Sequence, residues 1–265
     1  MDKPLTLPAL LAMKARGQKI ATLTAYDAAF AAVMDAAGVD LILVGDSLGM
    51  VVQGHPGTLP VTLDQMVYHA ACAARGTRRA VLAADLPFMS YSSVGQALDS
   101  AARLVREAGV QMVKLEGGRK RLEVIRALAE QDIPVCAHLG LLPQSVHKLG
   151  GYLVQGRDER AAQTMLEDAI LLQEAGAGML VLECIPAALA GEITAALSIP
   201  TIGIGAGPAC DGQILVCYDM LGITPGNRPK FSKDFLAGAD GVAGAVRRYV
   251  AEVREGRFPG PEHSF

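Results

Sequence analysis

The sequence predicts an α/β protein of the (β/α)8, or TIM, barrel class, and three observations carry that prediction. The chain has 265 residues, and such barrels typically take about 250 residues. Short apolar runs without period-2 alternation recur along it, as expected for parallel strands that are buried on both faces. Stretches with helical spacing separate most of these runs, and each parallel crossover needs such a covering helix. We therefore expect a single barrel domain over residues 1–265.

Eight strand-like runs follow one another along the chain, and Gly or Pro bounds many of them. They cover residues 20–27, 41–49, 80–87, 112–118, 134–140, 179–186, 200–207 and 212–219. The helical stretches between them cover residues 28–37, 63–75, 94–108, 119–130, 160–175 and 186–197. Several helical stretches end in Gly, which suits a left-handed residue at a helix C-terminus.

The connection between the last two runs is unusually short. Only residues 208–211 separate them, which is too few for a helical crossover. Strand eight therefore begins later than residue 212 or follows a degenerate turn. A doubly wound open sheet remains an alternative on this point.

The composition excludes several function classes. Hydrophobic residues make up 51% and charged residues 19% of the chain, so it is not a disordered protein. Aromatic residues are only 5% and Trp is absent, which argues against stacking platforms for single-stranded nucleic acid. With 24 basic against 27 acidic residues, the chain also lacks the basic excess of a duplex binder. We expect small-molecule partners and no nucleic acid.

The cysteines and the apolar runs indicate a cytoplasmic protein without membrane contact. The N-terminal segment is too polar and too interrupted by Pro for a signal peptide, and no apolar run approaches the roughly 20 residues that span a bilayer. Five cysteines without a CxxC pair form neither a disulfide framework nor a zinc pattern, and we expect buried, reduced thiols. They are Cys72, Cys136, Cys184, Cys210 and Cys217.

Nearly every predicted strand carries one ionisable residue at or near its C-terminal end. In a barrel these ends converge on one rim, where enzymes of this class place their chemistry. An acid at such a place can also cap the next helix, and for Asp27 and Asp219 both interpretations stand. Buried carboxylates without a cation or partner are costly, so the set requires a counter-charge. Its members are Asp27, Asp46, Asp85, Glu116, His138, Glu183 and Asp219.

A divalent cation bound by Asp46 and Asp85 would supply that counter-charge. Ligand sets made only of oxygen suit a hard ion such as Mg²⁺, which keeps some of its waters. Glu116 either coordinates the ion directly or orients its bound water. Isolated His138 is more often a hydrogen-bonding residue near the core than a metal ligand.

Lys114 and Ser47 are the candidate substrate contacts beside this metal site. Lys114 lies two residues before Glu116, so on a strand both side chains face the barrel interior. A Lys there neutralises a substrate carboxylate, forms a Schiff base, or only pairs with Glu116. A neighbouring metal favours anion binding, since the ion already supplies the electrophile. Ser47 offers a hydroxyl and a backbone N–H at the start of a loop.

Glu183 is the candidate general base. Its neighbours are apolar, and burial raises the proton affinity of a carboxylate, as a base that works near neutrality requires. The alternative is a structural Glu paired with Lys or Arg. Two long segments punctuated by Gly and Pro, 50–60 and 141–159, are candidate lids. The glycines of 203–207 either cradle a phosphate or let the backbone approach a flat ligand.

Seven segments that contain these residues have a distinctive sequence. They are VGDSLGM (44–50), ADLPFMSY (84–91), VKLEGG (113–118), AHLGLLPQS (137–145), GGYLVQG (150–156), VLECIP (181–186) and IPTIGIGAGPACDGQILV (199–216). In content and order they closely resemble the ketopantoate hydroxymethyltransferase family, and the likeness runs from about Thr6 to Arg254. Leu142 stands where a Thr is expected and Leu153 where a longer polar residue is common, which affects only the second lid.

The resemblance implies a barrel of the phosphoenolpyruvate/pyruvate-binding type, and hence a closed sheet. It implies transfer of a hydroxymethyl group from 5,10-methylenetetrahydrofolate to 3-methyl-2-oxobutanoate (α-ketoisovalerate) through a Mg²⁺-stabilised enolate. The product is 2-dehydropantoate (ketopantoate), and the reaction is the first step of pantothenate biosynthesis. The resemblance also implies a homodecamer built from two pentameric rings.

By motif position, the resemblance assigns roles to the residues of the rim. Asp46 and Asp85 would bind one Mg²⁺ per subunit, with Glu116 in or just outside its coordination sphere. Asp46, Ser47, Asp85 and Lys114 would contact the keto acid. Our own hypothesis is that Lys114 acts there through its charge alone.

Glu183 would be the proton acceptor by the same resemblance, and His138 is carried over only as a pocket residue. Lys148 and Arg157 are candidates for contacts with the polyglutamate tail of the folate.

Two other functions stay open at this point. A related Mg²⁺-dependent barrel of the isocitrate-lyase or phosphonopyruvate type makes or breaks a C–C or C–P bond without folate. Such enzymes usually carry a catalytic Cys in a short Lys/Arg-Cys-Gly-type loop, and the sequence has no such loop. A non-catalytic ligand-binding barrel or sensor predicts scrambled acids at the strand ends, whereas convergent acids mark a functional site.

Overall fold

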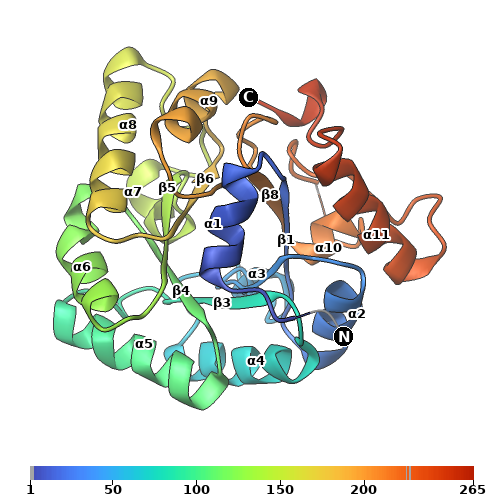
Figure 1. Ribbon diagram of the computed structural model, residues 1–265, viewed down its shortest axis with the longest axis horizontal. Coiled ribbons are helices and arrows are strands. Elements are labelled where there is room, and N and C mark those ends of the chain that lie inside the picture. The colour runs from blue at the N-terminus through green and yellow to red at the C-terminus, as the bar shows by residue number, and fades with distance from the viewer. Residues whose placement is uncertain (1–2, 225, 227) are drawn as a thin grey trace.

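Eight parallel strands close into one barrel (Figure 1). The computed structural model describes residues 3–224, 226 and 228–265. Each strand pairs with the next along the chain, and β8 pairs with β1 to complete the ring. The strands are β1 (Ile20–Thr24), β2 (Leu41–Val44), β3 (Val81–Asp85), β4 (Met112–Glu116), β5 (Val135–Gly140), β6 (Met179–Glu183), β7 (Thr201–Ile204) and β8 (Gly212–Leu215). The barrel prediction is confirmed, and the open-sheet alternative is wrong.

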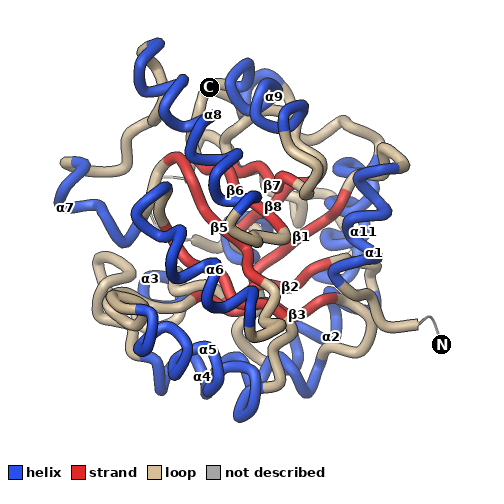
Figure 2. Tube along the Cα trace, turned by 60° about the vertical axis from the view of Figure 1, so that its left-hand side comes forward, coloured by secondary structure: helices blue, strands red, loops and turns tan. Residues whose placement is uncertain are grey.

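Helices form the outer layer, and Figure 2 shows them in blue around the red strands. The α-helices are α1 (Leu7–Ala15), α2 (Ala28–Ala36), α3 (Leu48–Val51), α4 (Leu63–Gly76), α5 (Val94–Ala108), α6 (Leu122–Glu130), α7 (Val146–Leu149), α8 (Glu159–Glu174), α9 (Ala187–Ala196), α10 (Cys217–Met220) and α11 (Gly241–Arg254). Short 3₁₀ turns are η1 (Arg119–Arg121), η2 (Pro143–Ser145) and η3 (Pro261–His263). Five of the six predicted helices agree with the structure to within one residue at each end, and the sixth begins as the turn η1.

The connection from β7 to β8 contains no helix, as its length predicted. Helix α11 instead covers the junction of the last and first strands. The single hydrogen of its Tyr249 hydroxyl is shared between the carbonyl of Thr22, at 2.8 Å, and that of Gln213, at 2.9 Å. The prediction of a strand through residue 219 is wrong: β8 ends at Leu215, and the next residues turn into α10. Closure therefore needs only a short last strand.

Helix α1 covers the N-terminal end of the barrel. Pro8 in its first turn is compatible with a helix start, where no intrahelical N–H bond is lost. A Cβ on Gly178, just before β6, would lie 2.6 Å from the side chain of Leu7, so the helix packs against that end. Lys14 pairs with Asp211, just before β8, at 2.7 Å. Because this end is covered, ligand access is from the C-terminal rim.

The strands are buried on both faces because helices cover the outside and side chains fill the inside. Each fully buried aliphatic side chain contributes about 1.5–3 kcal/mol. Among the described residues, no helix has both the length and the apolar character needed to cross a lipid bilayer. The interior side chains include Leu41, Leu43, Ala83, Met112, Cys136, Met179, Ile202 and Ile214.

Candidate active site

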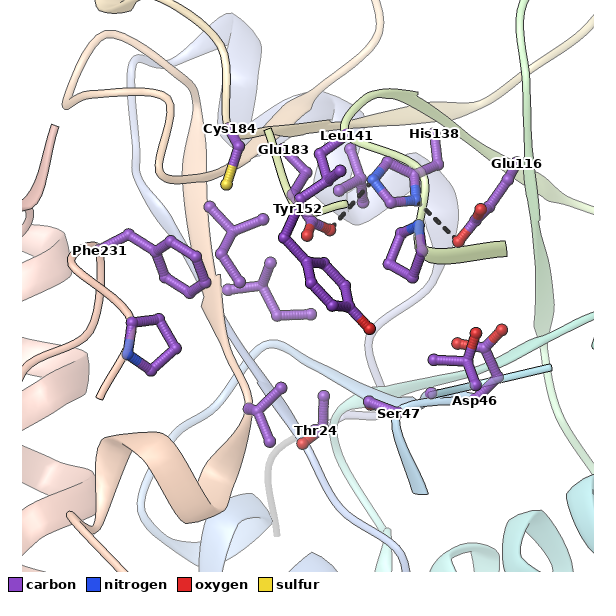
Figure 3. A pocket seen from close by; sticks show the side chains of 18 of the residues that line it. Thr24, Asp46, Ser47, Glu116, His138, Leu141, Tyr152, Glu183, Cys184 and Phe231 are labelled. Atoms are coloured by element: carbon purple, nitrogen blue, oxygen red, sulfur yellow. Dashed lines mark ion pairs between the residues drawn. The ribbon is translucent and has the colours of Figure 1, made fainter. Parts of the chain in front are cut away.

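A cavity of about 480 Å³ opens at the C-terminal ends of the strands (Figure 3). Its two sides differ in chemistry. The polar side contains all the site residues assigned above, namely Asp46, Ser47, Asp85, Lys114, Glu116, His138 and Glu183. The other side is apolar, with Val154, Cys184, Ile204, Ile214, Val216 and Phe231.

Asp27 and Asp219 do not line this cavity. Asp27 is the N-cap of α2 and accepts a hydrogen bond from the Phe30 N–H at 2.9 Å. Asp219 lies within α10, where its carboxylate accepts a hydrogen bond from the Thr224 hydroxyl. Both acids are therefore structural, which decides between their two interpretations.

Asp46 lies just beyond β2 and is buried. Its hydrogen-bond donor is the neutral side-chain amide of Gln144, at 2.8 Å from Oδ2. Burial raises the pKa of Asp46 well above its usual value, and the neighbouring carboxylates of Asp85 and Glu116 raise it further. Ionised Asp46 therefore needs more positive charge than Lys114 supplies.

Lys114 and Asp85 form a buried ion pair at 2.7 Å. They are register partners on β4 and β3, so strand pairing itself brings them together. Burial disfavours the charged amine, but Asp85, Glu116 and Asp46 outweigh burial and raise the pKa of Lys114. The expectation of a simple pair with Glu116 is therefore corrected, because the direct partner is Asp85. A protonated amine is not nucleophilic, which favours the electrostatic role over a Schiff base.

His138 lies between two carboxylates, as the dashed lines in Figure 3 show. Its Nε2 is 3.3 Å from Glu183 Oε2, and its Nδ1 is 3.6 Å from Glu116 Oε1. Burial and Lys114 oppose the charged imidazole, but the two carboxylates outweigh them and raise the pKa of His138. Burial likewise opposes ionisation of Glu116, yet His138, Lys114 and the Gln144 N–H lower its pKa. Glu183 thus has a histidine partner in place of the Lys or Arg considered above.

The acids at this rim outnumber its cations, which suits a hard divalent ion. Asp46 and Asp85 lie at the same mouth, since Asp85 Oδ2 accepts the Asp46 N–H at 2.9 Å. Glu116 Oε1 is buried and lacks a hydrogen-bond partner within the described part of the chain. In residues 3–224, 226 and 228–265, no three His, Cys, Asp or Glu side chains are arranged as a metal cage. The residues therefore fit a site in which two carboxylates bind the ion and water or substrate oxygens complete it.

Gln144 is a site residue that the sequence did not reveal. Its Nε2 donates to Asp46 and, at 3.1 Å, to the Leu86 carbonyl, while its backbone N–H donates to Glu116 at 3.1 Å. The Tyr91 hydroxyl donates to its side-chain oxygen. A Gln in a Pro-containing loop usually faces water, so nothing local to AHLGLLPQS predicted this buried role.

Both candidate lids reach the cavity. Tyr152 of the second lid lies over it, and its hydroxyl is 3.6 Å from Met50 Sδ of the first. In Figure 3 this hydroxyl points toward the side of Asp46 and Ser47. Burial raises the pKa of Tyr152, and Glu183, Asp46 and Glu116 add to the effect. The phenol therefore stays neutral over a negative site.

The glycines of segment 203–207 allow close packing against other side chains of the protein, and not the approach of a ligand. A Cβ on Gly205 would lie 3.0 Å from the Phe265 ring and 3.1 Å from the Phe231 ring. A Cβ on Gly207 would lie 2.5 Å from that of Ala187. Gly205 and Gly207 also have positive φ, at +61° and +76°, which favours glycine. Tight intramolecular packing thus accounts for these positions, and the phosphate-cradle hypothesis has no support here.

All five cysteines are free, as expected, and Cys72 alone among them is not fully buried. Burial raises the pKa of the Cys210 thiol to about 11 and that of Cys136 to about 12. Such thiols are poor nucleophiles at neutral pH.

A closed parallel barrel with buried acids and a lysine at its C-terminal rim defines the class: a TIM-barrel enzyme with its site at the usual end. The chain belongs to the ketopantoate hydroxymethyltransferase family, whose model matches residues 4–261. It is 63% identical to the 3-methyl-2-oxobutanoate hydroxymethyltransferase of Methylococcus capsulatus, over all of this chain and 98% of that one. It is 58% identical to the protein of that name from Nitrosococcus oceani, over 98% of this chain and 99% of that one.

The solved structures similar to this one share its fold. A putative phosphonomutase from Burkholderia cenocepacia aligns with a TM-score of 0.62 at 19% identity, over 78% of this chain and 89% of that one. A 2,3-dimethylmalate lyase of the PEP mutase/isocitrate lyase superfamily aligns with a TM-score of 0.59 at 19% identity, over 80% and 81%. These likenesses confirm the barrel fold, and the family model and the relatives above confirm the predicted family. Membership of an enzyme family also excludes the sensor alternative. The only support left for the isocitrate-lyase alternative is that such enzymes have the same fold.

Proposed function

We propose that the protein transfers a hydroxymethyl group from 5,10-methylenetetrahydrofolate to 3-methyl-2-oxobutanoate. With one water consumed, the products are 2-dehydropantoate and tetrahydrofolate, in the first step of pantothenate biosynthesis. The names of relatives at 56–63% identity support this activity. The observation that carries it is one cavity holding an Asp46–Asp85 pair, a charged Lys114 and the Glu183–His138 pair.

The polar side of the cavity suits a 2-oxo acid, which has a keto oxygen next to a carboxylate. Lys114 offsets the negative charge of that carboxylate, and the Ser47 hydroxyl lies on the same wall of the cavity. Asp46 and Asp85 would hold one Mg²⁺ per subunit, with Glu116 beside it. When bound, this ion would polarise the keto group and stabilise negative charge on its oxygen.

Glu183 is the residue suited to accept the proton from C3 of the keto acid. It is the last residue of β6, and its side chain is at the border of the polar and apolar sides. His138 Nε2 lies 3.3 Å from Glu183 Oε2 as an ion pair, without the geometry of a hydrogen bond, and attracts the carboxylate through its charge. Because the imidazole is buried, water screens this attraction only weakly.

The apolar side of the cavity suits the flat ring of the one-carbon donor. Val154, Ile204, Val216 and Phe231 present aliphatic and aromatic surface there. Lys148 and Arg157 are exposed on the second lid, where they would meet the negative tail of a polyglutamylated folate. Tyr152 of the second lid contacts Met50 of the first over the cavity. Closure of the two lids would limit the access of bulk water, so that the one water consumed serves the transfer and not loss of the one-carbon unit.

We propose a cytoplasmic homodecamer as the working form, and unpaired thiols suit a reducing compartment. The exposed Tyr68 on α4 and Val105 on α5 offer apolar surface for subunit contacts. Light scattering tests the assembly, which requires ten chains of 27.7 kDa each.

The direct test of the chemistry is exchange of the C3 proton of 3-methyl-2-oxobutanoate in D₂O with Mg²⁺. We expect Glu183→Gln to slow exchange by about 10²–10⁴-fold, the usual contribution of a general base. Glu252→Gln, which changes a buried acid outside the cavity, is the matched control and keeps the wild-type rate. Exchange as fast in Glu183→Gln as in wild type would remove Glu183 from the mechanism. A borohydride-trapped adduct on Lys114 would overturn its electrostatic role.

Turnover to 2-dehydropantoate should also require added 5,10-methylenetetrahydrofolate. Product formation without any folate would contradict this proposal and favour the folate-independent alternative described above.

A further inference from the structure

Tyr26 is a buried residue next to the cavity that neither the motifs nor the proposed mechanism uses. It lies two residues beyond β1, only 2% of it is exposed, and its hydroxyl is 2.8 Å from Ser47 Oγ. His69 Nδ1 donates to the backbone carbonyl of Tyr26 at 2.8 Å, and the Tyr26 ring lies 5.9 Å from the Tyr218 ring. The phenol is therefore held in one place.

The Ser47 hydroxyl is not used to cap the helix that follows it. The Ser47 backbone is itself helical, with φ −51° and ψ −18°, so its side chain makes no capping hydrogen bond to α3 and its hydroxyl can bond elsewhere. The backbone leaves room for this orientation only because residue 45 is glycine. A Cβ on Gly45 would lie 2.8 Å from Ser47 Oγ and 3.5 Å from Asp85 Oδ2. The hydroxyl thus lies between Tyr26 and the cavity that it lines.

The neighbours of Tyr26 favour one direction for the hydrogen bond. The Cys217 N–H, which can only donate, donates to Thr24 Oγ1 at 3.0 Å, so the Thr24 hydroxyl keeps its own hydrogen to offer. Thr24 is the last residue of β1, two residues before Tyr26, and its hydroxyl lowers the pKa of the phenol against the effect of burial, as a hydrogen-bond donor does. Burial raises the pKa of Tyr26 well above its usual range, with Cys217 and Asp85 adding to the effect, so the phenol keeps its proton. That proton is available to Ser47.

We propose that Tyr26 is a positioning residue whose hydroxyl donates to Ser47 Oγ. A serine hydroxyl has one hydrogen, so a bond received from Tyr26 leaves that hydrogen to donate into the cavity. There it meets the carboxylate of the bound 2-oxo acid, and a charge-assisted bond of this kind is stronger than a neutral one. The inference rests on the proposed function, because it names the group that Ser47 recognises.

Binding of 3-methyl-2-oxobutanoate with Mg²⁺ and without folate, measured by calorimetry, tests this inference. We expect Tyr26→Phe to weaken binding about fivefold and Ser47→Ala about tenfold, as loss of one hydrogen bond predicts. The double variant should bind no more weakly than Ser47→Ala, since the phenol acts only through Ser47. In turnover, Tyr26→Phe should raise KM by the same factor and leave kcat within about twofold.

Tyr249→Phe is the matched control. It removes another buried hydroxyl, whose partners among the described residues are two backbone carbonyls outside the cavity. It should lower Tm and leave the affinity for the keto acid unchanged. Gly45→Ala, which displaces Ser47 Oγ without touching the phenol, is a second variant and should weaken binding at least fivefold.

The outcomes separate the two proposals. Wild-type affinity in Tyr26→Phe, or an effect that adds fully to that of Ser47→Ala, would overturn the role of Tyr26 and leave the proposed function intact. Failure of the wild-type protein itself to bind the keto acid would overturn the proposed function, and the inference with it.

Discussion

Asp40 and Asp46 lie at opposite ends of strand β2 and differ in what surrounds them. Both are buried, with 2% and 3% of their surface exposed. Asp40, before the strand, pairs with Arg79 at 2.9 Å and with Arg254 at 3.1 Å, and accepts the Ala21 N–H at 3.0 Å. Asp46, beyond the strand, receives the neutral amide of Gln144 and has two further carboxylates nearby.

The difference shows how one residue type serves structure at one end of the barrel and function at the other. Burial raises the pKa of both acids. At Asp40 a backbone N–H and two guanidinium groups counteract burial, whereas at Asp46 the charges of Asp85 and Glu116 add to it. The N-terminal end thus supplies its own counter-charges, and the C-terminal rim leaves negative charge for a ligand to neutralise. Uncompensated buried charge of this kind is typical of functional sites.

The contrast between Asp40 and Asp46 predicts its largest effect for the Asp46→Asn variant, which should lose catalytic activity. We expect turnover of 3-methyl-2-oxobutanoate to fall by about 10³-fold or more, because the Lewis-acid site is worth several kcal/mol. Without divalent ions, the free energy of unfolding should not fall, since one member of a like-charged group is lost. Steady-state kinetics and urea denaturation measure the two quantities. A marked loss of stability with activity retained would make Asp46 a structural residue like Asp40.

The next effect is stabilisation by Mg²⁺ itself. At a concentration 100 times its Kd, an ion that binds only the folded state adds about 2.7 kcal/mol to the free energy of unfolding. We expect wild-type protein to gain this stability, measured as a rise in Tm, and Asp46→Asn to lose most of the gain. Asp40→Asn should respond as wild type does. An equal rise in all three proteins would place the ion elsewhere.

A smaller effect is expected for the stability of Asp40→Asn. The change leaves Arg79 and Arg254 without their shared carboxylate, and we expect a loss of about 2 kcal/mol. This is below the cost of breaking a fully buried pair, because Arg254 is 45% exposed. Arg79→Met should cost a similar amount. If urea denaturation gave Asp40→Asn the same free energy of unfolding as wild type, with or without a drop in kcat, Asp40 would not have the structural role assigned to it.

The smallest effect is expected on the stability of a Glu252 variant. Glu252 is a buried acid paired with more than one basic side chain. Burial opposes its ionisation, but Lys233, at 2.6 Å, and Arg248, at 3.2 Å, lower its pKa below 4.5. A depressed pKa contributes stability above the unfolded value, and that stability is lost as pH falls through the folded value.

We therefore expect Glu252→Gln to cost about 1 kcal/mol at neutral pH, comparable to one hydrogen bond. The cost should vanish in acid, where the denaturation midpoints of variant and wild type converge. A gap that persists below the folded pKa would indicate that packing, and not charge, is responsible.

Local signals in the sequence predicted much of this. Apolar runs with helical stretches between them identify the barrel, because strands covered by helices must be apolar on both faces. The ionisable residues that end these runs include Asp46, Asp85, Glu116 and Glu183, which the barrel brings to one rim. The same pattern also included Asp27 and Asp219, which lie outside the cavity. Asp27 caps α2, and Asp219 belongs to the short helix α10 and not to a strand.

The composition and order of the chain determined by themselves the barrel, the end at which the acids gather and the family. Only the tertiary structure decided which groups pair: Lys114 with Asp85 through strand register, Gln144 with Asp46, and Tyr26 with Ser47. The reason is physical. Whether a strand is buried depends on its own side chains, whereas a hydrogen bond or ion pair depends on the position of a partner 21 to 98 residues away. That position exists only once the barrel has closed.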